Sequence, residues 1–305
     1  MAGPAFAPAP FPGAQRPAPV SVDGAALVGA VALRASEEWR LDTPTGAYRI
    51  FLALPEAAPP PGGFPVLTVL DANACFATVA EAMRRATHRP GATGVRPAAV
   101  VGIGYPTEGS YSQERRRLDY TPGPSSEGGG GPCGGRDRFL DTITHRIRPL
   151  VRARLPVDEK QQSLLGHSLG AFFALDVLLH DTGCFRHYVA ISPSVWWDRP
   201  RLEHGIARLG RLAGPGAGAT VAPRAAISVG AWEQSLAPWQ RNRPDSDAAA
   251  LRRGRRAMVD NAREIAALLH ESLPPDSVRF DLFPDEDHAS VFPVALGRAL
   301  RFLAG

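Results

Sequence analysis

The chain has 305 residues and a formal charge of +4, and its basic side chains are almost all arginine, because Lys160 is the only lysine. So mild a charge indicates no nucleic-acid partner, and no apolar run approaches the length of a membrane span. Three irregularly spaced cysteines, Cys75, Cys133 and Cys184, exclude a disulfide framework and indicate neither a metal site nor a cofactor. We therefore expect a cytoplasmic protein with a small-molecule partner and no membrane partner.

The first 22 residues are rich in alanine and proline and lack the basic start and continuous apolar core of a secretion signal, so a disordered tail is expected there. Strand-like and helix-like patterns then alternate over 23–305. Strands are expected at 48–54, 66–70, 98–105, 163–165, 187–191, 225–229 and 278–283, and helices near 74–87, 139–151, 255–271 and 292–303. Pro149 should bend its helix or mark its last turn. This alternation predicts a single α/β domain, with a mainly parallel sheet covered by helices on both faces.

One segment, 121–135, interrupts the pattern with glycine, proline and serine, including four consecutive glycines from Gly128 to Gly131. Such a composition predicts a flexible loop. It is either a tolerated surface insertion or a flexible rim of the functional site, because loops that follow sheet strands carry the site in folds of this kind.

The pattern Gly166-His167-Ser168-Leu169-Gly170 lies between an apolar run and an amphipathic stretch. This strand, sharp turn and helix context is typical of the nucleophile elbow of an α/β-hydrolase fold. Small neighbours let the serine oxygen project from the backbone, and the helix N-terminus favours an anion beside it. Ser168 is therefore the candidate nucleophile. The alternative is a glycine-bounded turn with an idle serine.

A serine nucleophile needs a base, usually held by an acid, in the chain order serine, acid, histidine. His288 fits the last place, because it follows the last expected strand and precedes the C-terminal helix. Glu233 lies just beyond the strand at 225–229, where this fold places the acid. Other carboxylates compete by residue type alone: Asp198, Asp245, Asp285 and Asp287. A Ser-His dyad without an acid also remains open.

An oxyanion hole needs two donors near the nucleophile. The amide of Leu169 follows Ser168 and is the first candidate. The second should come from the loop after the strand at 66–70, at the backbone of Ala72 or Asn73. Asp71 is interpreted as a residue that fixes this loop.

Several segments together resemble the esterase D group of α/β hydrolases, in the branch of siderophore esterases that open enterobactin-type and bacillibactin-type trilactones. The matching segments are Val69 to Asn73 with Phe76, Gly102 to Tyr105, Arg116 to Pro122, Gly166 to Gly170, Ser192 to Trp197, and Asp287-His288. The resemblance covers about residues 25–304 and implies hydrolysis of a carboxylic ester by Ser168 and His288. Family members have a triad or a dyad, and their usual oxyanion-loop glycine is Ala72 here.

A ferric tris-catecholate is a bulky trianion, so a site for it should present cationic and aromatic groups. The candidate substrate-binding residues are Arg116, Arg117, Trp196, Trp197 and Trp232. The two adjacent tryptophans are equally typical of core packing. The run Arg252, Arg253, Arg255 and Arg256 is interpreted as a solvated helix start.

Three functions are compatible with the sequence. The first is a serine esterase that cleaves a catecholate siderophore, with the ferric form as a candidate substrate. The second is a generalist carboxylesterase for small acyl or aryl esters. The third is a non-catalytic binding protein on a hydrolase fold, against which the presence of both Ser168 and His288 argues.

Overall fold

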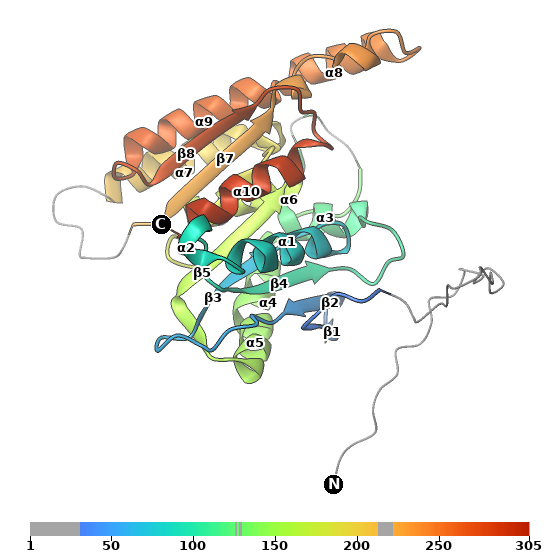
Figure 1. Cartoon of the computed structure of the whole chain (residues 1–305). Coiled ribbons are helices and arrows are strands. Elements are labelled where there is room, and N and C mark those ends of the chain that lie inside the picture. Colours follow the sequence, from blue (N-terminus) through green and yellow to red (C-terminus); the bar gives the residue numbers. More distant parts are fainter. Residues whose placement is uncertain (1–30, 126, 128–129, 213–221, 305) are drawn as a thin grey trace, which may run out of the picture. The chain divides into compact units, whose positions relative to one another are not determined.

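The computed structural model describes residues 31–125, 127, 130–212 and 222–304, and the predicted tail at 1–22 lies outside them. The chain divides into two units, Met1–Leu33 and Arg34–Gly305, and the second contains the sheet. In the described residues this sheet has eight strands in the order β1-β2-β4-β3-β5-β6-β7-β8 (Figure 1). The strands are β1 Ser36–Thr43, β2 Gly46–Ala53, β3 Phe64–Val69, β4 Ala99–Gly104, β5 Val157–His167, β6 His187–Ile191, β7 Arg224–Gly230 and β8 Val278–Phe283.

The pairings agree with the expected mainly parallel sheet. Strands β4, β3, β5, β6, β7 and β8 run parallel, whereas β1 pairs antiparallel with β2 and β2 with β4. Strand β1 was not predicted from the sequence. Its residues are mostly charged or polar and half-exposed at the edge of the sheet, so it lacks the apolar alternation that marks a strand, and its register with β2 holds it in place.

Helices cover both faces of the sheet (Figure 1). Helix α1 (Ala72–Thr87) packs against α10 (Val291–Ala304) on one face, and α6 (Leu169–His180), α7 (Arg199–Leu212) and α9 (Met258–Ser272) follow one another on the other. The remaining described α-helices are α2 Pro90–Thr93, α3 Gln113–Tyr120, α4 Arg136–Thr142, α5 Arg148–Arg154 and α8 Ser246–Arg256. The arrangement is that of an α/β hydrolase.

Two helical predictions need correction. The stretch expected at 139–151 consists of α4, a π-helical turn at Ile143–Ile147 and α5, which continues to Arg154. Pro149 lies in the first turn of α5, directly after the π-helical turn, and the helix continues past it to Arg154, so it does not mark the last turn. The helix expected at 255–271 is divided into α8 and α9 at Ala257, whose φ is 42°.

The hydrophobic core is densest around β5 and α6. Every residue from Leu169 to Leu179 is buried, so α6 is enclosed by the sheet and its neighbouring helices, and its buried carboxylate Asp176 pairs with Arg136 and Arg201. Rings of Tyr120, Phe139 and Phe173 pack against one another at centroid distances of 5.2 to 5.8 Å. The junction of β5 and α6 therefore has a rigid foundation. Among the described residues, no helix combines the length and the apolar character needed to span a bilayer.

Candidate active site

Ser168 lies at the turn between β5 and α6, with φ 58° and ψ −118°. A non-glycine residue rarely adopts this backbone conformation, and it aims the side chain out of the turn. Gly166 is required beside it, because a Cβ there would collide with the backbone of Gly170. The backbone is fixed on both sides by hydrogen bonds from Ser168 N to Ile191 O (3.0 Å) and from Ser194 N to Ser168 O (3.1 Å).

His288 follows β8 and lies over the turn. Its Nε2 is 3.0 Å from Ser168 Oγ, and its Nδ1 is 2.6 Å from Glu233 Oε2. Glu233 comes from the short helical turn after β7, at the position expected from the sequence. The histidine side chain is 43% exposed and the glutamate side chain is fully buried. The structure thus joins the three candidate residues in one continuous hydrogen-bond chain.

The other carboxylate oxygen of Glu233 has its own donors. Oε1 accepts hydrogen bonds from Ser192 Oγ at 2.5 Å and from Gly230 N at 2.8 Å. Ser192 has a φ of 53°, which turns its hydroxyl toward Glu233. The competing residues Asp285 and Asp287 make no contact with His288 Nδ1 within the described structure; Asp287 Oδ1 accepts from the amides of Ala289 and Ser290 instead.

The side chain of His167 contacts both the backbone and the ring of His288. Its Nε2–H donates to the backbone oxygen of His288 at 2.9 Å, and the two rings lie 4.6 Å apart. Burial, followed by the nearby His288 and Arg116, lowers the pKa of His167 to about 3, so its ring is neutral at ordinary pH. Sequence reasoning gave this residue no role; its place directly before the nucleophile was the only available signal.

The candidate oxyanion donors are the first amides of two helices. Leu169 is the first residue of α6, and Ala72 and Asn73 are the first two of α1. The first amides of a helix have no partner within the helix, so they are free to face an anion. The side chain of Asn73 is occupied elsewhere: its Nδ2 donates to Tyr105 O (2.9 Å) and its Oδ1 accepts from Tyr105 N (2.8 Å). Only its backbone remains as a donor.

Asp71 fixes this oxyanion loop, as the sequence indicated. It adopts a left-handed conformation (φ 54°) and is buried, and its Oδ1 accepts from Arg116 Nε at 2.7 Å and from the Tyr120 hydroxyl at 3.2 Å. Arg116, a candidate substrate-binding residue, is itself 93% buried in this pair. Its guanidinium is therefore largely engaged with Asp71, although it still borders the larger of the two cavities described next.

Two cavities meet at Ser168. The smaller, about 230 Å³, is bordered by Ser194, Trp196, Arg252, Arg253 and Arg256 together with the catalytic candidates. The larger, about 500 Å³, is bordered by Arg116, Arg117, Glu127, Trp196, Trp197 and Arg256, among others. Three of the four arginines interpreted as a solvated helix start thus line the cleft. The sequence did not reveal this, because it depends on where α8 lies relative to the site.

The arginines of this cleft differ in what they contact. Arg256 lies 3.8 Å from the ring centre of Trp196, and its Nη2 is 3.0 Å from Glu127 Oε2. Glu127 belongs to the predicted flexible loop, so the described part of that loop borders the cleft. Trp197 is buried and donates to Gly123 O at 3.1 Å, which anchors the same loop.

Trp232 is not brought to the cleft. It borders neither cavity and packs edge-on against Trp239 at 4.7 Å.

Among the residues that the structure describes, no cluster of three or more histidine, cysteine or acidic side chains is placed to hold a metal ion. The arrangement can transfer a proton from Ser168 to His288, stabilise the resulting imidazolium and present amides to an oxyanion.

The chain matches the model of a family described as putative esterase over residues 43–264. It is 34% identical over 268 residues to the ferri-bacillibactin esterase BesA of Bacillus subtilis, covering 84% of each chain. It is 34% identical to the siderophore triacetylfusarinine C esterase of Aspergillus fumigatus, covering 78% of this chain and 81% of the relative. The solved siderophore hydrolase EstB of Aspergillus nidulans superposes with a TM-score of 0.78 at 28% identity, covering 90% of this chain and 97% of that one.

Proposed function

The chain belongs to the putative esterase family, and on that premise we propose that it cleaves the ester bonds of a catecholate siderophore with Ser168, His288 and Glu233. It is an ester hydrolase that acts on a small molecule. The observation that carries the proposed residue roles is the hydrogen-bond chain from Ser168 Oγ through His288 to Glu233, with distances of 3.0 and 2.6 Å. A chain of this order activates a serine in unrelated hydrolases.

In the first step, Ser168 Oγ attacks the ester carbonyl carbon while His288 Nε2 takes the hydroxyl proton. The negative charge that forms on the carbonyl oxygen meets the amide of Leu169 and an amide of the Ala72-Asn73 backbone. The intermediate collapses, the carbon–oxygen bond to the alcohol breaks, and His288 returns its proton to the leaving oxygen. The acyl group then remains on Ser168.

In the second step, water attacks the acyl-serine carbonyl while His288 accepts its proton. Collapse releases the carboxylic acid and returns the proton to Ser168. Glu233 accepts the Nδ1–H of His288 and holds the imidazole in one orientation, while Ser192 and Gly230 donate to its other carboxylate oxygen. No group other than water is consumed.

The siderophore substrate is supported by the cleft and by the relatives. Arg117, Arg252 and Arg256 border the two cavities beside Ser168, with Trp196 as an aromatic surface. A ferric tris-catecholate carries three negative charges on a bulky aromatic body, which suits such a cleft. The two relatives from Bacillus subtilis and Aspergillus fumigatus are named as siderophore esterases.

A generalist carboxylesterase is the second candidate, and one feature favours it. Two of the cleft arginines are already paired, Arg116 with Asp71 and Arg256 with Glu127. A cleft with fewer available cations would discriminate less strongly in favour of a trianion. Substrate comparison separates the two candidates.

The test is the ratio of kcat/KM for a catecholate trilactone, iron-loaded and iron-free, to that for a nitrophenyl acetate. We expect at least one trilactone form to exceed the simple ester by about a hundredfold or more, which corresponds to about 2.7 kcal/mol of transition-state binding. A trilactone cleaved no faster than the simple ester would support the generalist function. If neither were cleaved and a fluorophosphonate left Ser168 unlabelled, catalysis by Ser168 itself would be refuted.

The proposal also includes a reducing compartment such as the cytoplasm. Cys75, Cys133 and Cys184 are all free, and burial raises the pKa of the Cys75 thiol to about 12, which keeps it unreactive. Fractionation of cells that produce the full chain would test it; recovery mainly from an oxidising compartment would contradict it.

A further inference from the structure

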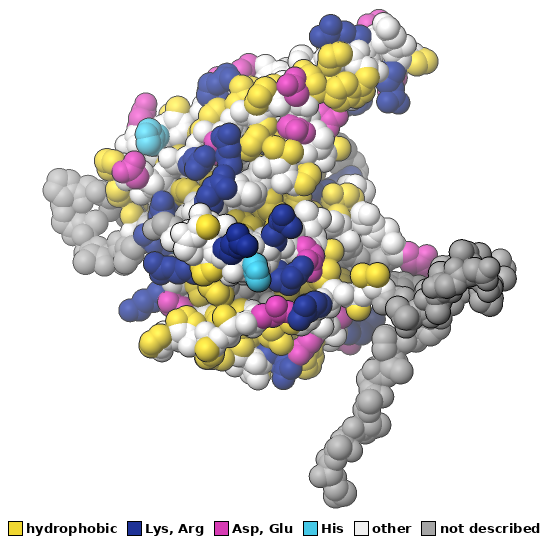
Figure 2. Space-filling model, viewed as in Figure 1, with side chains coloured by type: hydrophobic (Ala, Val, Ile, Leu, Met, Phe, Trp, Pro, Cys, Tyr) yellow, Lys and Arg dark blue, Asp and Glu magenta, His cyan; other side chains and the backbone are white. Residues whose placement is uncertain are grey.

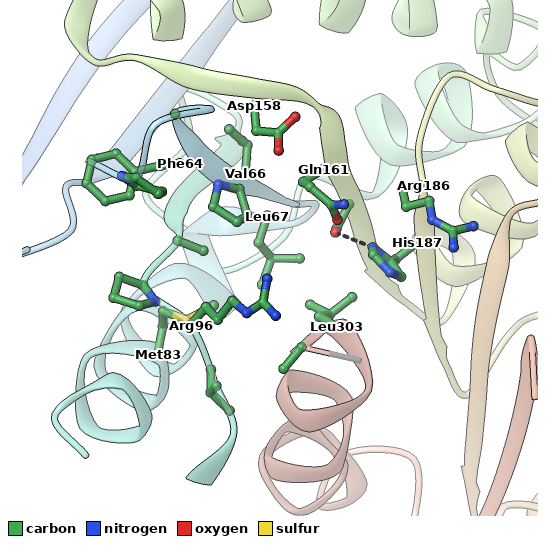
Figure 3. A pocket seen from close by; sticks show the side chains of 18 of the residues that line it. Phe64, Val66, Leu67, Met83, Arg96, Asp158, Gln161, Arg186, His187 and Leu303 are labelled. Atoms are coloured by element: carbon green, nitrogen blue, oxygen red, sulfur yellow. Dashed lines mark hydrogen bonds between the residues drawn. The ribbon is translucent and has the colours of Figure 1, made fainter. Parts of the chain in front are cut away.

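A further cavity, distinct from the two beside Ser168, lies at the opposite end of the sheet, where β3, β5 and β6 begin. Its volume is about 430 Å³, which is within the range of small-molecule sites. Apolar side chains from three elements form its wall: Leu67 of β3, Met83 of α1, and Leu300 and Leu303 of α10 (Figure 3). Strand β5 joins the two regions, and the five residue steps from Ser163 to Ser168 span roughly 17 Å.

Two arginines border this cavity without an acidic partner. Neither Arg96 nor Arg186 forms an ion pair or side-chain hydrogen bond with any side chain that the structure describes, and the Nη1 atom of Arg186 is buried with no acceptor. Figure 3 shows Arg96 extending into the space between Leu67 and Leu303, with Arg186 on the side of His187. A buried donor without an acceptor is unfavourable until something supplies one.

The charges around the cavity leave an excess of one positive charge. Asp158 is the acidic residue among the lining side chains, and its Oδ1 already accepts from the amide of Lys160 at 2.8 Å. Two guanidinium groups against one carboxylate give a net charge of +1. Arg224 lies close behind and adds to the positive potential, since with burial it lowers the pKa of Arg186. Arginine side chains also gather on the outer surface over α1 and α10 (Figure 2).

A neutral polar pair completes the lining. His187 Nδ1 lies 3.3 Å from Ser163 Oγ, and both side chains are buried. Burial, followed by Arg186 and Arg224, lowers the pKa of His187 to about 4. The imidazole is therefore uncharged at ordinary pH and contributes hydrogen-bonding atoms without altering the net charge of the cavity.

We propose that this cavity is a binding site for a small organic monocarboxylate, held by Arg96 and Arg186 and packed against the wall of Leu67, Met83, Leu300 and Leu303. A single negative charge balances the lining, and a carboxylate supplies the acceptor that Arg186 lacks. The apolar wall requires a carbon body behind the carboxylate, which a bare inorganic anion does not have. The site is separate from Ser168 and does not depend on the proposed substrate.

The test uses the full chain after treatment with a fluorophosphonate, which closes the Ser168 site. Benzoate, its uncharged analogue benzamide and inorganic phosphate are titrated separately by calorimetry at low salt. We expect benzoate to bind with a Kd of about 1 mM or tighter, and at least about tenfold more tightly than either of the others. Equal binding of benzamide, tighter binding of phosphate, or no benzoate binding at that concentration would overturn the proposal.

Variants locate the site. Arg96→Gln and Arg186→Gln should each weaken benzoate binding by about tenfold. Leu303→Trp should abolish most of the binding, because the larger side chain fills the apolar side of the cavity while both arginines remain. Arg301→Gln is the matched control, because Arg301 is an exposed cation on α10 that does not line the cavity. Thermal unfolding of each variant verifies its folding. Unchanged benzoate affinity in folded Arg96→Gln and Leu303→Trp proteins would refute the assignment even if Arg186→Gln failed to fold.

Discussion

Two ends of the parallel sheet each carry a serine beside a histidine, with Ser168 just after β5 and Ser163 at the residue of β5 that pairs with the first residue of β6, and the two pairs differ in every other respect. At the carboxyl end, Ser168 lies on a turn with φ 58° and meets Nε2 of His288, whose Nδ1 is held by Glu233. At the amino end, Ser163 lies within the regular strand and meets Nδ1 of His187, and no carboxylate holds that ring in the described structure. A serine near a histidine is therefore not by itself a catalytic unit.

The difference lies in what surrounds each pair. Ser168 precedes α6, so free helix amides face the space above it, whereas the amides of Ser163 and its neighbours are used in the sheet. His288 is 43% exposed and can meet substrate, while His187 is buried with a pKa of about 4. The carboxyl end is built for proton transfer. The amino end combines unpaired cations with an apolar wall, which suits binding without reaction.

Removing each serine in turn should show the largest difference between the two ends of the sheet. Ser168→Ala should reduce kcat for any ester by about a thousandfold or more, because nucleophile and base act as a unit, and His288→Ala should do the same. Ser163→Ala is the matched control on the same strand and should change kcat by less than about twofold. Steady-state rates on a nitrophenyl ester measure both. A large loss in the folded Ser163→Ala protein would contradict the distinction drawn here.

Glu233→Gln tests whether the carboxylate accounts for the difference in reactivity between the Ser168–His288 pair and the Ser163–His187 pair. The amide keeps the size of the side chain but removes the charge that stabilises the His288 imidazolium, so we expect kcat to fall by about a hundredfold or more with little change in KM. The measurement is the kcat and KM of the variant on one ester. An unchanged rate would mean that Ser168 and His288 work as a dyad or that another carboxylate holds His288.

Two buried neutral histidines, His167 at the end of β5 and His187 at the start of β6, predict a pH dependence of stability. The folded pKa of His167, about 3, lies below its unfolded value near 6.5, so the unfolded state binds the proton more readily and stability falls as the pH drops below about 6.5. Between pH 7 and pH 5 the expected contribution of His167 is about 2 kcal/mol. His187 should act in the same direction, with its loss complete nearer pH 4.

Denaturant unfolding at a series of pH values measures this loss. His167→Asn should flatten the acid limb, whereas His145→Asn, at an exposed position, should leave it unchanged. If His167→Asn kept the full slope between pH 7 and pH 5, the ring would not be buried in its neutral form.

The smallest expected effect concerns recognition at the carboxyl end. Arg256→Gln removes the cation over Trp196 and should raise the KM for an anionic ferric catecholate about fivefold to tenfold, while the KM for a neutral ester stays the same. Arg255→Gln is the control, because this neighbouring arginine of α8 does not border the cleft. Equal effects of the two substitutions would indicate a general charge effect without a specific contact.

The residues that the structure brings together at the carboxyl end have local signals in the sequence. Gly166, Ser168 and Gly170 belong to one contiguous five-residue pattern, and the backbone geometry requires a glycine at position 166. Glu233 and His288 each follow a recognisable strand. The sheet was predicted for the same reason, since buried strands have continuous apolar runs. Strand β1 was missed because its charged edge sequence carries no such run.

The contacts made between distant segments could not be predicted. The hydrogen bond from His167 to His288, the turn of Ser192 toward Glu233, and the pairing of Arg256 with Glu127 each join residues that no local pattern connects. Trp232, a candidate by residue type, packs against Trp239 instead. The cavity at the amino end is assembled from several separate segments, and its existence depends on how α1 and α10 pack over the sheet.

The most direct test of the central claim is a mass-spectrometric map of the serine that reacts with a fluorophosphonate. The account predicts one adduct, on Ser168, formed at the same rate in the Ser163→Ala protein and far more slowly when His288 is replaced by alanine. An adduct on a different serine, or labelling of Ser168 that does not depend on His288, would contradict it.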